Sequence, residues 1–315
     1  MLFQAACAGL AVALSACTSS GGHGPLTPGT LASRNGEAIT VGSFDFPESV
    51  LLAEIYGQAL DAGKFPVRIL PNLGPREVVD PALVDGLLQL VPEYAGSALE
   101  FFSLGRLSAT SNAGAANRVL AGSVAGRGLV VARPTAAQDA NAIVVTAATA
   151  ARYGLRSIAD LAKVAPRLVF GGPPECPGRA YCLPGLKRVY GLHFKAFIPL
   201  DAGGPLTLQA LVAGYVGAAL LFTTDPSIPA RHLVVLADDR GLQPAENITP
   251  LVGRDALARY GPRLLATLNR VSALLDTATL RTLDARVEGG GQSPRLVAGS
   301  WLRFRGLIPA GGEVR

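Results

Sequence analysis

The sequence predicts an α/β fold with two lobes, and two patterns along the chain support this prediction. From Ile39 onward, short apolar runs that are typical of strands alternate with runs that have the apolar spacing of helices. Two further extended stretches, 130–134 and 233–238, separate blocks of this alternation and predict that the chain crosses twice between lobes. With 315 residues, 49% of them hydrophobic, the chain is long enough to form both lobes.

The first elements follow from local patterns. Residues 39–42 form a short apolar run that predicts a strand. Residues 47–62 predict a helix, because Pro47 suits a first helical turn while Leu51 and Ile55 lie on one face. The same alternation continues along the chain. Further strands are predicted at 67–70, 87–91, 143–145, 168–170 and 218–222, and further helices at 75–85, 93–104, 147–153 and 206–214.

Alternating strands and helices are typical of a largely parallel sheet. The predicted first lobe comprises residues 38–134 and 237–315, and the predicted second lobe comprises residues 135–236. After the second crossing the chain is expected to be mainly helical, with amphipathic runs at 255–275 and 294–307. Ligands of open α/β sheets bind beyond the carboxyl ends of the strands, so we expect a ligand cleft between the lobes.

The N-terminal residues predict a lipoprotein leader. An apolar run at 10–14, too short to span a bilayer, leads into a Leu-Ser-Ala-Cys sequence that ends at Cys17 and resembles a bacterial lipobox. We therefore expect residues 1–17 to be a signal peptide, with Cys17 acylated, and residues 18–37, rich in Gly, Ser, Thr and Pro, to be a flexible tether. The alternative is a buried helix that ends in Cys, since the first four residues lack the Lys or Arg of an ordinary leader.

Two cysteines in the middle of the chain lie close together in sequence. Outside the cytoplasm, Cys176 and Cys182 are expected to form a disulfide that closes a small loop. The alternative is a zinc-binding pair, but His23, His193 and His232 show no ligand spacing with these cysteines. We therefore expect a disulfide and no metal site.

Composition and motifs argue against several classes of function. The net charge of +5 comes almost entirely from scattered arginine, which differs from the clustered basic face of a nucleic-acid-binding protein. The sequence contains no Gly-x-Ser-x-Gly elbow, no His-Glu-x-x-His motif and no catalytic carboxylate pair with an adjacent histidine. We therefore expect a binding protein without a cofactor, rather than an enzyme.

Five short segments, in this order and spacing, match one known family. They are 41–48 (VGSFDFPE), 92–97 (PEYAGS), 138–141 (QDAN), 183–186 (LPGL) and 223–226 (TTDP). The chain thereby resembles the osmoprotectant-binding proteins of ABC importers, which bind glycine betaine, choline or carnitine. The resemblance implies a type II periplasmic-binding-protein fold and a small-molecule ligand. It also implies a monomer that is lipid-anchored on the extracytoplasmic face of the cell membrane and works with ABC permease subunits.

The resemblance also implies which residues bind the ligand. A protein holds a quaternary ammonium group against several aromatic faces and holds a carboxylate with arginine and hydroxyl donors. On the family pattern, Tyr94 and Phe222 match residues of the aromatic cage. Ser97 and Arg179 match the residues that bind the carboxylate, and Asp139 matches the acidic residue at the start of the second lobe.

Four positions depart from the family pattern. Asn141 and Leu208 stand where the family has cage aromatics, Phe44 replaces a common lysine, and Ser49 replaces a common glutamine. At about 0.5–2 kcal/mol per cation–π contact, the loss of two faces is expected to weaken betaine binding by about one to three powers of ten. The sequence therefore leaves open a betaine-like ligand or a different, uncharged or aromatic solute. It also leaves open whether the protein serves transport or sensing.

Overall fold

The structure is a computed structural model that describes residues 38–107 and 112–309. The predicted leader, the tether and Cys17 lie outside the described residues. Residues from Ala38 onward form one unit. Within the described ranges, no helix is both long enough and apolar enough to cross a membrane.

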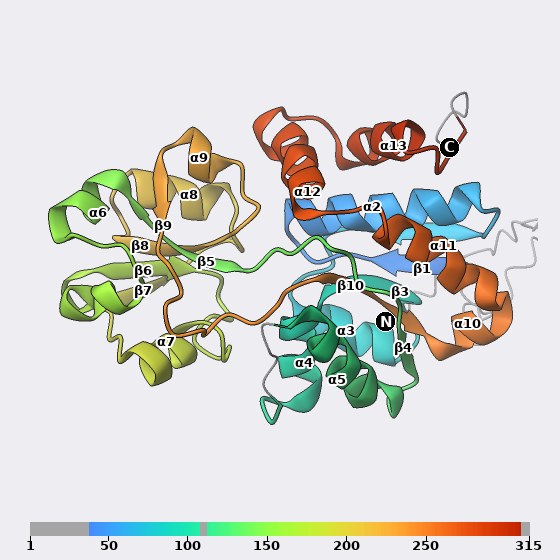
Figure 1. Ribbon diagram of the computed structural model, residues 1–315, viewed down its shortest axis with the longest axis horizontal. Helices are drawn as coiled ribbons and strands as arrows, with labels where there is room; N and C mark the ends of the chain where they lie inside the picture. Colours follow the sequence, from blue (N-terminus) through green and yellow to red (C-terminus); the bar gives the residue numbers. More distant parts are fainter. Residues whose placement is uncertain (1–37, 108–111, 310–315) are drawn as a thin grey trace, which may run out of the picture. The chain divides into compact units, whose positions relative to one another are not determined.

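Five strands form the first sheet, in the order β2-β1-β3-β10-β4 (Figure 1). Their bounds are β1 Ile39–Gly42, β2 Val67–Leu70, β3 Leu90–Tyr94, β4 Leu129–Val131 and β10 Ile248–Gly253. Strand β1 runs parallel to β2 and β3, whereas β10 runs antiparallel to both β3 and β4. The last strand of the chain therefore lies inside a sheet that the first part of the chain begins.

The second sheet has the same pattern, in the order β7-β6-β8-β5-β9. Its strands are β5 Asn141–Thr146, β6 Val169–Gly172, β7 Ala196–Pro199, β8 Ala218–Phe222 and β9 Leu233–Val235. Strand β6 is parallel to β7 and β8, and β5 is antiparallel to β8 and β9. Each sheet therefore has one antiparallel strand between two neighbours, and each has its own buried apolar core.

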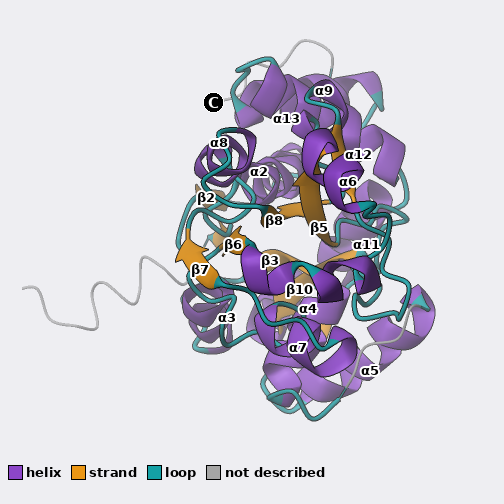
Figure 2. Cartoon of the chain, turned by 90° about the vertical axis from the view of Figure 1, so that its left-hand side faces the viewer, coloured by secondary structure: helices purple, strands orange, loops and turns teal. Residues whose placement is uncertain are grey.

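Helices flank the strands of both sheets (Figure 2). Around the first sheet they are α2 Pro47–Ala62, α3 Arg76–Val84, α4 Ala95–Ser103, α5 Ala113–Ala125, α10 Arg254–Tyr260, α11 Pro262–Ser272, α12 Thr277–Asp284, the π-helix Ala285–Gly289 and α13 Pro294–Phe304. Around the second they are α6 Ala147–Tyr153, the 3₁₀ turns Ala159–Lys163 and Ala165–Arg167, α7 Leu183–Tyr190, α8 Pro205–Val212 and α9 Ser227–Ala230. Helix α2 packs against α11 and α13, which buries Leu51 and Ile55 completely.

The α/β class is confirmed, and four of the five strands in each sheet run in the same direction, as predicted for a largely parallel sheet. The antiparallel strands are β5 and β10, and each of them directly follows a crossing segment. A chain that enters a sheet from such a crossing runs against the strands that alternate with helices, so strand–helix alternation alone does not reveal the direction of these two strands.

Several predicted bounds need correction. The strand predicted at 87–91 begins at Leu90, since Leu87 is exposed in the preceding turn, and it continues to Tyr94 so that α4 begins only at Ala95. Strand β10 falls in the stretch that was expected to be mainly helical. The helix predicted over 255–275 is two helices, because Gly261, with φ +69°, separates α10 from α11.

The crossing stretches predicted at 130–134 and 233–238 lie partly in β4 and β9, and the segments that connect the two sheets are 132–140 and 236–247. These two crossing segments run antiparallel to one another. Gln138 and Asn247 form an isolated bridge, and the Asp139 amide donates to the Glu246 carbonyl at 3.2 Å. The Ile248 amide donates to the Ala137 carbonyl at 3.2 Å. The connection between the two sheets is therefore a hydrogen-bonded pair of extended segments (Figure 1).

Candidate ligand-binding site

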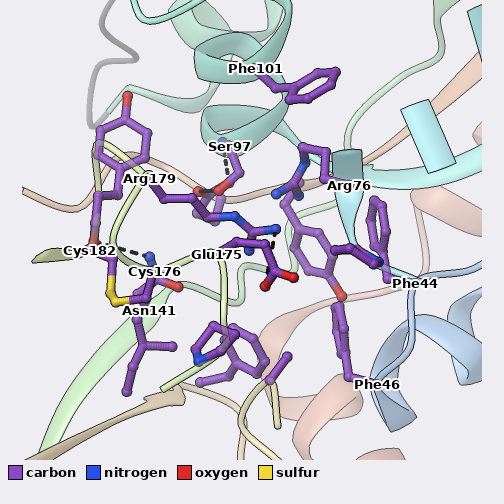
Figure 3. Close-up of a pocket in the computed structure, with 18 of the residues that line it drawn as sticks. Phe44, Phe46, Arg76, Ser97, Phe101, Asn141, Glu175, Cys176, Arg179 and Cys182 are labelled. Carbon is purple, nitrogen blue, oxygen red and sulfur yellow. Dashed lines mark hydrogen bonds and ion pairs between the residues drawn. A yellow bond between two sulfur atoms is a disulfide. The ribbon is translucent and has the colours of Figure 1, made fainter. Parts of the chain in front are cut away.

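A cavity of about 90 Å³ is lined by residues from the segments of both sheets (Figure 3). Seven of the eight residues predicted to bind ligand line it, namely Phe44, Tyr94, Ser97, Asp139, Asn141, Arg179 and Phe222. Leu208 does not line this cavity, because helix α8 places it at a separate surface depression beside Leu206 and Tyr215. The structure thus brings together residues that are far apart in the sequence.

Aromatic rings form one wall of the cavity. Phe46 lies at its centre, with its ring centroid 5.2 Å from that of Phe222, 5.9 Å from that of Tyr94 and 6.0 Å from that of Phe44. These four residues are called the aromatic cluster below. The local cause is the start of helix α2, where Phe46 takes an extended conformation, with φ −137°, immediately before Pro47.

The cavity has more aromatic side chains than the family comparison predicted. Phe46, Phe101 and Tyr181 also line it and were not singled out in the sequence. Phe46 lies within the first matching segment, and its position before the helix-starting Pro47 is the signal that could have identified it. Rings at other positions therefore line the cavity, although Asn141 stands where the family has an aromatic residue.

A buried ion network supports Phe44. The Arg76 guanidinium lies 5.0 Å from the Phe44 ring centroid and donates to both carboxylate oxygens of Glu93, at 2.7 Å and 2.9 Å. Burial alone would lower the pKa of Arg76, but the charges of Glu93 and Asp80 raise it overall. Arg76 is consequently a fixed cation whose hydrogen bonds are directed to the protein.

Ser97 is bound to a carboxylate of its own chain. Its hydroxyl donates to Glu246 Oε1 at 2.6 Å, while the amides of Gly96 and Ser97 donate to Glu246 Oε2 at 3.0 Å and 3.1 Å. Burial raises the pKa of Glu246 to about 7. The close approach requires glycine at position 96, since a Cβ there would lie 2.4 Å from Pro244 Cγ.

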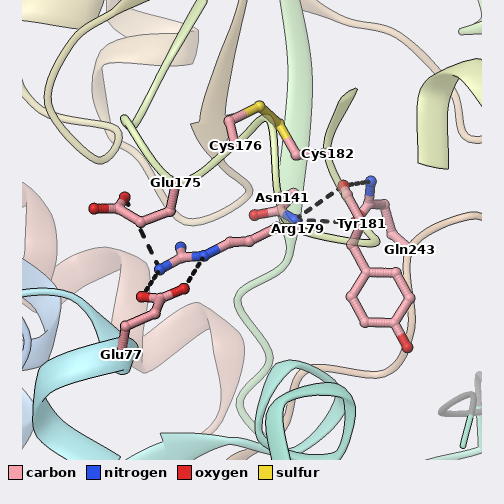
Figure 4. Close-up of a disulfide and its surroundings, with 8 residues drawn as sticks. All are labelled: Glu77, Asn141, Glu175, Cys176, Arg179, Tyr181, Cys182 and Gln243. Carbon is pink, nitrogen blue, oxygen red and sulfur yellow. Dashed lines mark hydrogen bonds and ion pairs between the residues drawn. A yellow bond between two sulfur atoms is a disulfide. The ribbon is translucent and has the colours of Figure 1, made fainter. Parts of the chain in front are cut away.

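Arg179 lies in the loop between strand β6 and helix α7 that the Cys176–Cys182 disulfide closes (Figure 4). The predicted disulfide is therefore present. The Arg179 guanidinium donates to both oxygens of Glu77, at 2.9 Å and 3.3 Å, and lies 4.0 Å from Glu175. Glu77 is on helix α3, beside the first sheet, so this ion pair joins the two sides of the cavity.

Asn141 braces the crossing segments. Its side-chain amide donates to Gln243 Oε1 at 3.1 Å and to the Tyr181 carbonyl at 3.4 Å. The Gln243 side chain donates to the same carbonyl at 3.0 Å. Asn141 thus lines the cavity while its amide protons are used by the protein.

Buried carboxyl groups lie beneath the aromatic cluster. The Tyr94 hydroxyl donates to Glu48 Oε1 at 2.6 Å, and the Thr224 hydroxyl donates to Glu48 Oε2 at 2.7 Å. Asp139 accepts from the Thr224 amide at 2.9 Å and from the Thr223 hydroxyl at 3.1 Å. Burial raises the pKa values of both Glu48 and Asp139. The hydroxyl of Tyr94 is thereby fixed, and its ring is presented to Phe46.

A family model described as the substrate binding domain of ABC-type glycine betaine transport system matches residues 37–303. The chain is 30% identical to the glycine-betaine-binding protein of Pseudomonas aeruginosa, over 87% of this chain and 90% of that protein. It is also 30% identical to the glycine betaine-binding protein YehZ of Escherichia coli, over 85% of this chain and 90% of that protein.

Solved structures agree with these matches. The apo structure of YehZ from Escherichia coli has a TM-score of 0.60 at 28% identity, covering 86% of this chain and 99% of that chain. A glycine betaine/carnitine/choline ABC transporter structure has a TM-score of 0.66 at 23% identity, covering 85% and 99%. The predicted type II periplasmic-binding-protein fold is confirmed. The chain therefore belongs to the family of substrate-binding domains of ABC-type glycine betaine transport systems.

Proposed function

We propose that this chain delivers a quaternary amine of the osmoprotectant class to the permease of an ABC importer, as a monomer and without catalysing a reaction. Its family provides extracytoplasmic substrate-binding components of such importers. The position of Phe46 supports this ligand class, because its ring packs against those of Tyr94 and Phe222 in the cavity. Aromatic faces that line a cavity hold a quaternary ammonium by cation–π contact.

Calorimetric titration of the purified protein with glycine betaine, choline, carnitine and proline betaine tests this proposal. Phe46→Ala is expected to weaken the binding of these amines by about threefold to thirtyfold, since it removes a cation–π face. Phe304→Ala is the matched control, because Phe304 is 83% exposed and does not line the cavity. Its affinities should equal those of the unmodified protein.

A second solute class remains the alternative. The aromatic cluster also suits an uncharged or aromatic solute, which would stack on the faces of Phe46 and Phe222. At a ligand concentration a hundred times the dissociation constant, binding stabilises the protein by about 2.7 kcal/mol, which a thermal-shift screen detects. Stabilisation by such a solute and by none of the four amines would refute the osmoprotectant proposal.

We further propose that a lipid on Cys17 holds the protein at the cell membrane. The lipobox-like sequence before Cys17 and the extracytoplasmic role of the family support this anchor. Cys17→Ala is expected to abolish labelling with radioactive palmitate and to move the protein from the membrane fraction to the soluble fraction. Cys7→Ala is the control and should leave both unchanged. A Cys17→Ala protein that stays labelled would contradict the proposal.

Binding is proposed to close two lobes, residues 38–134 with 237–315 and residues 135–236, by rotation at the crossing segments. The bridge between Gln138 and Asn247 supports these segments as one paired hinge. Small-angle X-ray scattering should show a smaller radius of gyration in saturating ligand than in buffer. Identical scattering curves with bound ligand would refute closure.

A further inference from the structure

The two groups that the family pattern assigns to a ligand carboxylate are both occupied by carboxylates of this chain. The Ser97 hydroxyl donates to Glu246 at 2.6 Å, and the Arg179 guanidinium forms two hydrogen bonds with Glu77, at 2.9 Å and 3.3 Å. A ligand carboxylate would need at least one of these donors. It therefore has to compete with an internal carboxylate.

The contact between Arg179 and Glu77 is the more exchangeable of the two. The side chains of Arg179 and Glu77 are 29% and 45% exposed, whereas Glu246 is only 3% exposed. Exposed ion pairs are weak, since water solvates both partners when they separate. Partial burial would raise the pKa of Glu77, but the hydrogen bond and the charge of Arg179 lower it overall. Glu77 is thus a charged competitor for Arg179 at neutral pH.

Among its described lining residues, the cavity offers a carboxylate no further basic side chain. The only basic side chains that line it are Arg76 and Arg179, and Arg76 is bound to buried Glu93. Two further carboxyl groups, Glu100 and Glu175, also line the cavity. A carboxylate that displaced Glu77 would leave three acidic side chains near one arginine, an arrangement that like-charge repulsion opposes.

We propose that Glu77 is a specificity-determining residue, whose carboxylate occupies Arg179 and thereby favours quaternary amines without a carboxylate over those that carry one. This inference rests on the proposed function and names the ligands that the same site prefers. Choline and glycine betaine form the decisive pair, because both carry a trimethylammonium group, while choline has a hydroxyl where glycine betaine has a carboxylate.

The test is the ratio of the dissociation constants of glycine betaine and choline, measured by calorimetry. The unmodified protein is expected to bind choline more tightly. Glu77→Gln removes the competing charge and should tighten glycine betaine binding by about tenfold or more, relative to choline. In an Arg179→Gln background, Glu77→Gln should no longer change this ratio, because no arginine is left for either carboxylate.

Glu100→Gln is the matched control. It removes an acidic side chain that lines the same cavity, but Glu100 forms no ion pair among the described residues. Its ratio should change by less than about threefold, since only a screened, longer-range interaction is lost. Circular dichroism melting of each variant verifies that it is folded.

The outcomes separate this inference from the proposed function. If Glu77→Gln changes both dissociation constants by the same factor, Glu77 acts only on closure, because its ion pair joins the two sides of the cavity. This result would overturn the inference but leave the proposed function standing. A larger effect of Glu100→Gln than of Glu77→Gln would also overturn it. If neither these two amines nor carnitine and proline betaine bind to any variant, the proposed function fails and the inference fails with it.

Discussion

The two arginines of the cavity form similar ion pairs in very different surroundings. Arg76 is 11% exposed and its partner Glu93 is fully buried, whereas Arg179 and Glu77 are 29% and 45% exposed. Each guanidinium donates two hydrogen bonds to one carboxylate. Burial therefore decides their roles. The buried pair is a fixed support beneath the Phe44 ring, and the exposed pair is available for exchange with a ligand.

Removal of the buried cation is the strongest way to test this comparison. Arg76→Met is expected to lower the free energy of unfolding by about 3–5 kcal/mol, because it leaves Glu93 and Asp80 buried without a cation. Urea denaturation followed by circular dichroism measures the loss.

Replacement of the arginine in the exposed ion pair is the control for this prediction. Arg179→Met should cost about 1 kcal/mol or less, since water solvates Glu77 once its partner is gone. If both variants lost the same free energy, burial would not distinguish the two pairs.

The pH dependence of stability should also differ between the buried carboxyl group of Glu246 and the exposed one of Glu77. Burial raises the pKa of Glu246 from 4.5 to about 7. The folded protein then binds a proton that the unfolded chain releases, so the stabilisation is complete below about pH 4.5 and is lost as the pH rises through 7. At about 1.4 kcal/mol per pKa unit, the contribution amounts to about 3 kcal/mol.

Urea midpoints between pH 4.5 and pH 8 measure this effect, with Glu246→Gln as the variant. The fall in stability with rising pH should be smaller in Glu246→Gln than in the unmodified protein. Glu77 should act with the opposite sign, because its pKa is lowered in the folded state, so its contribution is lost as the pH falls. A Glu246→Gln protein with an unchanged pH profile would refute the proton assignment.

Local sequence patterns predicted the local parts of the fold. The bounds of helices 47–62 and 147–153 and of strand 218–222 are those of the structure, because apolar spacing and Pro47 act within a few residues. Strand β10 was missed, since its place between β3 and β4 depends on partners more than a hundred residues away.

The same distinction between local patterns and distant partners applies to the ligand-binding site. Tyr94 and Arg179 were identified through the family pattern, and the structure brings them to one cavity. The carboxylates that occupy the key donors were missed, because Glu77 and Glu246 lie 102 and 149 residues from the side chains they bind. No local pattern in one sequence reveals such a pair. The ligand preference proposed above therefore depends on the structure.

A smaller effect than that of Arg76→Met concerns the disulfide that closes the Arg179 loop, whose two cysteines are buried. The bond joins Cys176 to Cys182, six residues apart, and the Cys182 amide donates to the Arg179 carbonyl at 3.0 Å. Replacement of both cysteines by serine is expected to lower the free energy of unfolding by about 2 kcal/mol, as the entropy of closing so short a loop is small.

Thermal melting with and without dithiothreitol measures this loss. The reductant should lower the melting temperature of the unmodified protein and leave that of the double serine variant unchanged. An equal effect on both would contradict a role for the disulfide in stability.

Because Arg179 has no buried network like that of Arg76, its loop depends on this covalent bond to hold the guanidinium near Glu77. The double variant should therefore also narrow the difference between choline and glycine betaine binding.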